Sequence, residues 1–439
     1  MNASMKKLSV GRRAMGGLAL VVLMACGGGG GKSSEDREPG VPTYSLRFGT
    51  APNHVLEDEE FEVELYVVDE DGAIVSDFEG EAALSTLPHS TGGQLRGDAV
   101  ARIEGGVARF YGLSIDHYGR RYKLEASTQP VSKVLTIDVD VSLWNREGLY
   151  PGRAGHAIAY DSHRNTVIVY GGRTDFNGTP DGGTYEWDGE KWVKVSSGGP
   201  AAVFGMKMVY DPTIGRTVLF GGTDAAGVYV GGTWEWDGSA WTSSDSQGPA
   251  PGSRIAHAVT YAGPGEGVVV FGGTDESGQL LGDVWQRQGR NWQVATAGPS
   301  ARGLHAMCYD SRLGRVLMFG GVDATGKTLD DTWEFESGTW TLVDRGSVPA
   351  RMAHAMTFDE SRGVAVMHGG VFYQRHDLVP NTTWEWEEGA WKKLSMSGPS
   401  PRFGHAMVYD TAKAEVILLG GESHPTTLSG EWWSYKRPR

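Results

Sequence analysis

A Gly-Gly pair recurs six times in the second part of the chain, each time directly after a short apolar run. The first glycines of the pairs are Gly171, Gly221, Gly272, Gly320, Gly369 and Gly420, at spacings of 50, 51, 48, 49 and 51 residues. A period of that length is typical of a repeat architecture, in which neighbouring copies bury the apolar surface that one copy cannot bury alone. Each copy contains four strand-like pieces, here called A to D in chain order. The repeat therefore predicts an all-β region of six similar units.

The aromatic pattern inside each copy indicates the kind of unit. One copy reads PARMAHAMTFDESRGVAVMHGG and continues TTWEWEEGAWKKL: strand B ends at Gly-Gly, strand C carries an aromatic residue and strand D begins at Trp. This pattern resembles the kelch repeat, in which four strands form one blade of a β-propeller. The resemblance implies an all-β fold with six blades packed face to face.

Trp144 is the one tryptophan of the 15 that precedes the repeat. In five copies a strand-C residue is followed five residues later by the strand-D Trp, but the sixth copy ends at Arg439 without a strand D. Trp144 stands nine residues before Arg153, where the first copy begins. We expect the segment VSLWNRE to supply the outer strand of the last blade and to close the ring, which removes an open sheet edge. The predicted propeller spans residues 141–439.

Residues 43–140 show the alternation of a half-buried sheet. In FEVELYVVD, Phe61, Val63, Leu65 and Val67 fall on one face. About seven short strands separated by Gly, Asp and Pro turns favour an antiparallel sandwich. The order of the pieces, including GVARFYGLSIDHYGRRYKLEAS, resembles bacterial immunoglobulin-like domains, and the resemblance implies a spacer or an adhesive module.

The N-terminus has the pattern of a processing segment. MKKLSVGRR is basic, AMGGLALVVLMA is apolar but too short to span a bilayer, and LMAC resembles a bacterial lipobox with an unusual Met24 two residues before Cys26. The prediction is a signal peptide over 1–25, a lipid on Cys26 and a flexible tether over 26–42. The alternative is an ordinary secretory signal. The expected location is the bacterial cell envelope, as a lipid-anchored protein of the outer membrane, periplasmic or surface-exposed.

The charge balance limits the partners. The chain has 40 basic and 54 acidic residues, a formal net charge of −14. Such acidity argues against nucleic acid or an anionic membrane surface as a partner. We expect a monomer without a cofactor or metal that binds a protein or a glycan. Cys308 is the only other cysteine, so no internal disulfide is expected once Cys26 is acylated.

Loop lengths distinguish the two faces of the predicted disc. The distance from the strand-A aromatic to Gly-Gly is 11 residues in every copy, whereas the B–C and D–A connections vary in length. Variation on one face alone indicates ligand loops there. The longest, VFYQRHDLVPNTT at 371–383, presents Phe372, Tyr373, Arg375 and His376 as candidate binding residues. The alternative is a tolerant loop without a ligand.

A repeated RxxH motif opens strand A and gives a second candidate site. Its arginines are Arg153, Arg254, Arg302, Arg351 and Arg402, and its histidines are His156, His257, His305, His354 and His405. Five guanidinium groups near the channel mouth could hold a carboxylate or phosphate. The alternative is a need common to every blade, such as an arginine that bonds loop carbonyls. Val203 and Met206 replace the motif in the second copy. The histidines are expected to lie too far apart to share one metal.

Three enzyme families share this general shape. The sequence lacks the copper ligand set that galactose oxidase requires, and Cys308 directly precedes Tyr309, where neighbours point to opposite faces. Sialidases need an Asp-box that DGxxW fulfils only in part. A six-bladed kelch sialic-acid epimerase would suit the arginine ring and needs only acid and base groups. The leading prediction is a non-catalytic binding module, and an epimerase-like enzyme is the alternative.

Overall fold

The structure is a computed structural model that describes residues 44–57, 59–88, 92–117, 119–129, 131, 135–174, 181–201, 204–224, 226–244, 248–295, 298–372, 382–394, 398–423 and 427–436. The predicted signal peptide, Cys26 and the tether lie outside these residues. Tyr44–Arg439 is one compact unit. None of its described residues is helical, and none forms a helix with the length and hydropathy of a membrane span.

The first nine strands form one sheet, called here the N-terminal sheet. Its order is β1-β3-β7-β6-β4-β8-β9-β2, β5 pairs with β7, and only β2 and β9 are paired in parallel. The strands are β1 (Ser45–Phe48), β2 (His54–Leu56), β3 (Phe61–Val68), β4 (Gly80–Thr86), β5 (Leu95–Arg96), β6 (Val100–Glu104), β7 (Val107–Ile115), β8 (Gly119–Thr128) and β9 (Leu135–Ser142). The predicted alternation is confirmed, because Phe61, Val63, Leu65 and Val67 are all buried. The immunoglobulin-like assignment stays a prediction.

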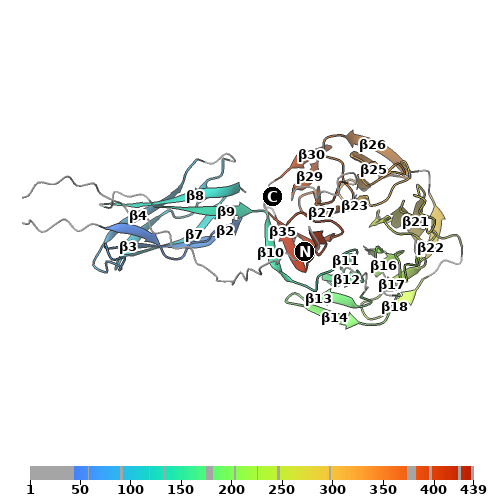
Figure 1. Ribbon diagram of the computed structural model, residues 1–439, viewed down its shortest axis with the longest axis horizontal. Coiled ribbons are helices and arrows are strands. Elements are labelled where there is room, and N and C mark those ends of the chain that lie inside the picture. The colour runs from blue at the N-terminus through green and yellow to red at the C-terminus, as the bar shows by residue number, and fades with distance from the viewer. Residues whose placement is uncertain are drawn as a thin grey trace, which may run out of the picture. The chain divides into compact units, whose positions relative to one another are not determined.

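Six four-stranded antiparallel sheets follow, and Figure 1 shows them arranged around a common centre. Blade 1 contains β11 (Ala157–Asp161), β12 (Thr166–Tyr170), β13 (Thr184–Trp187) and β14 (Trp192–Ser196). Blade 2 contains β15 (Lys207–Asp211), β16 (Arg216–Phe220), β17 (Thr233–Trp236) and β18 (Trp241–Ser243). Blade 3 contains β19 (Ala258–Tyr261), β20 (Val268–Phe271), β21 (Val284–Gln288) and β22 (Asn291–Val294).

The second half of the ring repeats this order. Blade 4 contains β23 (Ala306–Asp310), β24 (Arg315–Phe319), β25 (Asp331–Glu336) and β26 (Thr339–Arg345). Blade 5 contains β27 (Ala355–Asp359), β28 (Val364–His368), β29 (Thr383–Glu387) and β30 (Ala390–Lys393). Blade 6 contains β31 (Ala406–Asp410), β32 (Glu415–Leu419) and β35 (Glu431–Tyr435), with β10 (Trp144–Leu149) as its outer strand. A short hairpin precedes β35; its two strands, β33 (Glu422–Ser423) and β34 (Thr427–Leu428), have two residues each. The predicted six-bladed β-propeller is therefore confirmed.

The closing strand takes the place that the sequence predicts. β10 pairs with β35 antiparallel (Figure 1). In this pair Trp144 lies opposite Tyr435. The Trp144 indole N–H donates to Thr383 Oγ1 of blade 5 at 2.7 Å. The strand-D Trp241, Trp292 and Trp391 each make the same bond to a threonine of the preceding blade, at 2.8–2.9 Å. Trp144 is thus the strand-D tryptophan of blade 6, supplied from the other end of the ring.

Each contact between neighbouring blades has its own apolar core. Six clusters of buried side chains follow one another around the ring, each made by two adjacent blades. The strand-B runs are buried on both faces because a sheet lies on either side of them, as in Val268–Phe271 at 0 % exposed. The Asp that ends strand A holds the A–B hairpin: Asp161 Oδ1 accepts the backbone N–H groups of His163 and Arg164 at 3.0 and 3.1 Å.

Candidate functional site

The strand-A edges surround a channel at the centre of the ring. Strand A begins on the face of the B–C and D–A loops, called here the variable face, and ends at the A–B turns. Three cavities follow the strands in that direction: a mouth cavity of about 370 Å³, an inner cavity of about 110 Å³ and a far cavity of about 320 Å³. Every blade contributes lining residues to each, so the channel is a product of the complete ring.

A circle of backbone hydrogen bonds forms the rim of the mouth cavity. The residue before each motif histidine, or before Met206 in blade 2, has a positive φ: Gly155, Gly205, Ala256, Leu304, Ala353 and Gly404. Five bonds connect these residues from blade to blade, for example Leu304 N–H to the Ala256 carbonyl at 2.7 Å and Ala353 N–H to the Leu304 carbonyl at 2.8 Å. Five of the six rim N–H groups are therefore engaged within the protein, and the backbone sets the width of the opening.

Apolar side chains surround this rim. Phe204, Ile255, Leu304, Met352 and Phe403, one from each of blades 2 to 6, line the mouth cavity. Leu304 is 36 % exposed. It adopts a left-handed backbone conformation that costs an L-residue about 1–2 kcal/mol and that glycine adopts freely. Strain of this kind and exposed apolar surface often mark a binding site.

The five motif arginines lie inside the blades rather than in the channel. They are 0–2 % exposed, and none lines any of the three cavities. Each donates from Nη1 to the carbonyl of the first glycine in the Gly-Gly pair of its own blade, at 2.8–3.2 Å.

Carboxylates at or just before strand C complete the bonding of four motif arginines. Arg302 binds both oxygens of Asp331, at 2.7 and 3.1 Å, and Arg153, Arg254 and Arg402 pair with Asp181, Asp283 and Glu431. Arg351 has no such partner among the described residues; it lies over the Trp384 ring, and burial lowers its pKa to about 10. This placement favours the blade-level alternative for the arginines, and a ligand role stays an untested prediction.

The motif histidines fill the joints between blades. The second glycine of each of the last five pairs donates its N–H to the motif-arginine carbonyl of the next blade, as from Gly273 to Arg302 at 2.9 Å. The imidazole of the next blade packs against the first glycine, where a Cβ on Gly272 would approach His305 to 3.0 Å and the Arg302 carbonyl to 2.5 Å. Gly-Gly and RxxH are therefore two halves of one joint.

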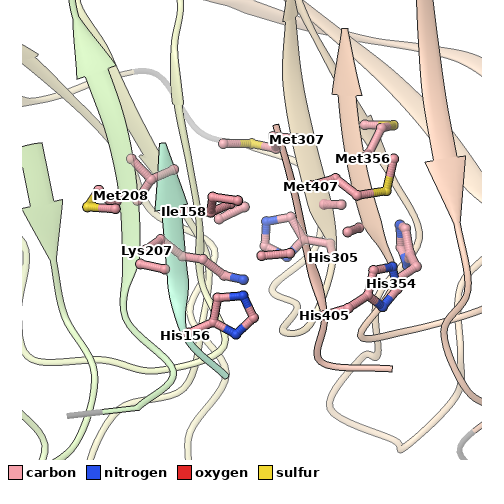
Figure 2. A pocket seen from close by; sticks show the side chains of 16 residues that line it. His156, Ile158, Lys207, Met208, His305, Met307, His354, Met356, His405 and Met407 are labelled. Carbon is pink, nitrogen blue, oxygen red and sulfur yellow. The ribbon is translucent and has the colours of Figure 1, made fainter. Parts of the chain in front are cut away.

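Burial keeps these imidazoles neutral. Desolvation, together with the neighbouring motif arginines, lowers the pKa of His257 and His354 to about 3 and holds those of His156, His305 and His405 well below the ordinary range. Figure 2 shows His156, His305, His354 and His405 around the inner cavity. No group of three His, Cys, Asp or Glu in the described part of the chain is arranged to hold a metal ion.

Lys207 is the residue of the channel that sequence reasoning missed. It opens β15 of blade 2 and lines both the mouth and inner cavities. The five other blades have alanine at this position: Ala157, Ala258, Ala306, Ala355 and Ala406. The sequence did carry a signal for Lys207. Blade 2 departs from the repeat at Val203 and Met206, and the same segment, FGMKMVY, has a lysine where the other blades have alanine.

The other sequence candidates are only partly placed. Phe372 is half-buried, whereas Tyr373, Arg375 and His376 lie outside the described residues. Val203 lies outside them as well. Cys308 is buried as a free thiol at the wall of the far cavity, where burial raises its pKa above the ordinary range. The loop at 371–383 stays a prediction.

Comparison with known proteins agrees with the repeat. Residues 233–421 match the family model described as the KLHDC2/KLHL20/DRC7 Kelch-repeats domain. Among solved structures, 147 chains match. One, "Structure of YjhT", has 13 % sequence identity and a TM-score of 0.53, with 64 % of this chain and 95 % of that chain covered. At that identity the likeness shows the fold alone. No curated protein matches.

Proposed function

We propose that this chain is a lipid-anchored protein of the cell envelope whose propeller acts as a non-catalytic binding module. Its ligand is a protein or a glycan, and the mouth cavity on the variable face is the centre of the site. Kelch propellers commonly serve as interaction modules, which supports the general class. The observation that carries the location is the apolar-rimmed cavity of about 370 Å³ to which all six blades contribute.

Chemistry and loop pattern support this face over the opposite one. Phe204, Phe403 and the exposed Leu304 surround the opening, and aromatic and large aliphatic side chains are typical anchors of binding sites. The loops whose lengths vary between blades leave from the same face. The A–B and C–D turns of the opposite face are nearly uniform in length, as expected of connections that only join strands.

A pair of leucine variants in one blade tests the site. Leu304→Arg places a large charged side chain at the rim, whereas Leu342→Arg changes an equally exposed leucine on the outer strand β26. The intact chain is titrated with a panel of envelope glycans, peptidoglycan fragments and purified envelope proteins, and binding is followed by calorimetry and thermal shift. We expect a panel member whose binding Leu304→Arg weakens at least about tenfold and Leu342→Arg leaves unchanged. Equal binding by both variants would place the site elsewhere.

The anchor is tested separately at Cys26. Metabolic labelling with palmitate should label the wild-type chain in a lipoprotein-processing host and should not label Cys26→Ser. The variant should also move from the membrane fraction to the soluble fraction, because lipid chains are the proposed attachment. Labelling that survives the substitution contradicts the lipobox.

The alternative is an epimerase-like enzyme, and the same panel distinguishes it. A binding module returns its ligand unchanged, whereas an enzyme needs a positioned acid and base and converts the sugar. Nuclear magnetic resonance of each bound sugar after prolonged incubation measures this directly. Conversion of any sugar faster than in buffer would replace the binding proposal by the enzymatic one.

A further inference from the structure

Lys207 is a cation without a counter-ion in the wall of the channel. It forms no ion pair or hydrogen bond with any described residue, and its side chain is half-buried. Burial lowers its pKa. Surface lysines are normally solvated, and buried ones are normally paired. An unpaired ammonium at this position therefore requires another explanation.

The groups around Lys207 do not supply negative charge. The nearest repeated groups are His156, His257, His305 and His354, which are neutral and whose pKa values Lys207 itself helps to lower. Arg173 and Glu422 also line the mouth cavity, but they are paired with each other. Figure 2 shows the Lys207 amine pointing toward the open centre, on the same level as His156. The amine is thus the unsatisfied charge of the cavity within the described part of the chain.

The structural explanation for this lysine is weak. Five of six blades form the same inner edge with alanine, so the fold does not need a long side chain there. The methionines one position further, such as Met208, Met307 and Met356, also line the inner cavity (Figure 2). Lys207 adds an unfavourable desolvation without a packing role that the other blades require.

We propose that Lys207 anchors the carboxylate of a small organic acid that enters the mouth cavity from the variable face. This inference rests on the proposed binding function and specifies the chemistry of the group that enters the channel. The ammonium donates charge-assisted hydrogen bonds to the carboxylate, while the apolar rim of Phe204, Leu304 and Phe403 covers the rest of the molecule.

A single carboxylate fits this site better than a phosphate. A phosphate carries up to two charges and is usually bound by several cations or by free backbone N–H groups. Here five of the six rim N–H groups are engaged with neighbouring blades, and the motif arginines are buried in their own joints. One ammonium within an otherwise neutral, apolar enclosure matches one negative charge with an apolar body.

The volume sets the size of the ligand. A dry apolar cavity of about 150 Å³ holds one benzene molecule. The mouth cavity, at about 370 Å³, is large enough for a phenyl ring together with a short acid side chain. A suitable probe is 3-phenylpropanoate, with 3-phenylpropanamide as its neutral counterpart of the same shape.

The experiment measures the affinity of the intact chain for both probes by isothermal titration calorimetry. We expect the acid to bind about 10- to 100-fold more tightly than the amide, the range for a hydrogen bond to a charged group. Lys207→Ala, which introduces the residue of the other five blades, should remove that preference without loss of thermal stability. Lys207→Met, which keeps the length of the side chain, should do the same. Lys327→Ala removes an exposed lysine from the same face and should leave the preference intact.

The outcomes separate this inference from the proposed function. If acid and amide bind equally and Leu304→Arg abolishes both, the mouth is a binding site but Lys207 is not its anion anchor. If the acid is preferred and Lys207→Ala keeps the preference, another group recognises the carboxylate and the inference is wrong. If neither probe binds at millimolar concentration, the carboxylate inference is overturned, and the glycan and protein panel decides the proposed function independently.

Discussion

The N-terminal sheet and the propeller bury different chemistry. Among the described residues of the sheet, Thr128 is the one buried polar residue, and its ion pairs, such as Arg109–Glu64, are partly exposed. The propeller buries arginine, histidine and acidic side chains in nearly every blade, including the Arg302–Asp331 pair at 1 % and 4 % side-chain exposure. A single sheet gains its register from alternating apolar residues. Six similar blades also need directional bonds, which hold neighbouring blades in one relative position.

The largest expected difference is in acid, which should destabilise the propeller more than the N-terminal sheet. The pKa values of six propeller histidines, His156, His257, His305, His354, His368 and His405, are lowered by burial. Their folded pKa lies below the unfolded value of 6.5, so their contribution to stability is complete above that value and is lost as the pH falls below it, toward about 3 for His257, His354 and His368. Each group adds a slope of up to about 1.4 kcal/mol per pH unit within this window.

Tryptophan fluorescence can measure this loss, because all 15 tryptophans lie at or after position 144. Urea unfolding should show a large decrease in the midpoint of the fluorescence transition between about pH 7.5 and about pH 5. The described histidines of the sheet, His54 and His117, are exposed, so a β-sheet circular dichroism signal should persist after the fluorescence transition. If both signals are lost together, or if the fluorescence midpoint does not change with pH, the two regions do not differ in their response to acid.

Removing one propeller arginine should have the next largest effect. Arg302→Ala leaves the buried Asp331 carboxylate without its bidentate partner, which typically costs about 3–5 kcal/mol of unfolding free energy. Arg109→Ala removes an exposed partner of Glu64 in the sheet and should change the urea midpoint very little. The double variant Arg302→Met with Asp331→Leu should recover most of the loss, since no charge stays buried. Equal effects of the two single variants would show that burial does not distinguish the regions.

Substituting a glycine in a blade joint by alanine should destabilise the protein more than the same substitution in a turn of the N-terminal sheet. Gly272 has φ +65°, and an added Cβ would lie 2.5 Å from the Arg302 carbonyl of the next blade. Gly272→Ala should therefore lose about 3 kcal/mol from strain and overlap together. Gly72, with φ +82° and no atom within 4 Å of its added Cβ, should lose only the strain, about 1 kcal/mol. Chemical denaturation of both variants measures the difference, and equal losses would mean that the joint yields to the methyl group.

The smallest change in unfolding free energy is expected for a substitution at Leu304, and this change should be stabilising. The sheet uses glycine at most of its left-handed positions, such as Gly72, Gly105 and Gly112, but the rim has a leucine. Leu304→Gly should relieve strain and raise the unfolding free energy by about 0.5 kcal/mol after the greater flexibility of the unfolded chain is included. The same variant should weaken ligand binding at the mouth. A loss of stability would instead show that the leucine side chain holds the rim together.

The sequence predicted the architecture well because its signals are local and repeated. The period of about 50 residues, the Gly-Gly pairs and the strand-D tryptophans indicated six blades, and the isolated Trp144 indicated the closing strand that β10 forms. Each signal depends on a backbone need that does not change from blade to blade. The same holds for Asp161, whose carboxylate bonds the hairpin backbone two and three residues on.

The candidate site could be predicted only in part. The sequence located the variable face and the channel mouth, but it treated the repeated RxxH as the conspicuous feature and overlooked Lys207. Repetition marks what every blade requires, and in the structure this is the bonding of arginine to a Gly-Gly carbonyl. A ligand site requires a departure from that repetition. Lys207 is such a departure, but a lone lysine in a strand carries no signal until its surroundings are known.

The sequence by itself determined the strand order, the number of blades and the pairing of the two ends of the ring. The first two depend on alternation, turn residues and a period of about 50 residues, and the third depends on Trp144, the strand-D tryptophan that stands outside the period. Only the tertiary structure decided which polar side chains are engaged within joints and which face the channel. Burial and partners arise from residues roughly 18 to 250 positions apart, as in Arg302 with Gly320 and Arg173 with Glu422. A side chain's availability to a ligand is therefore a property of the assembled ring.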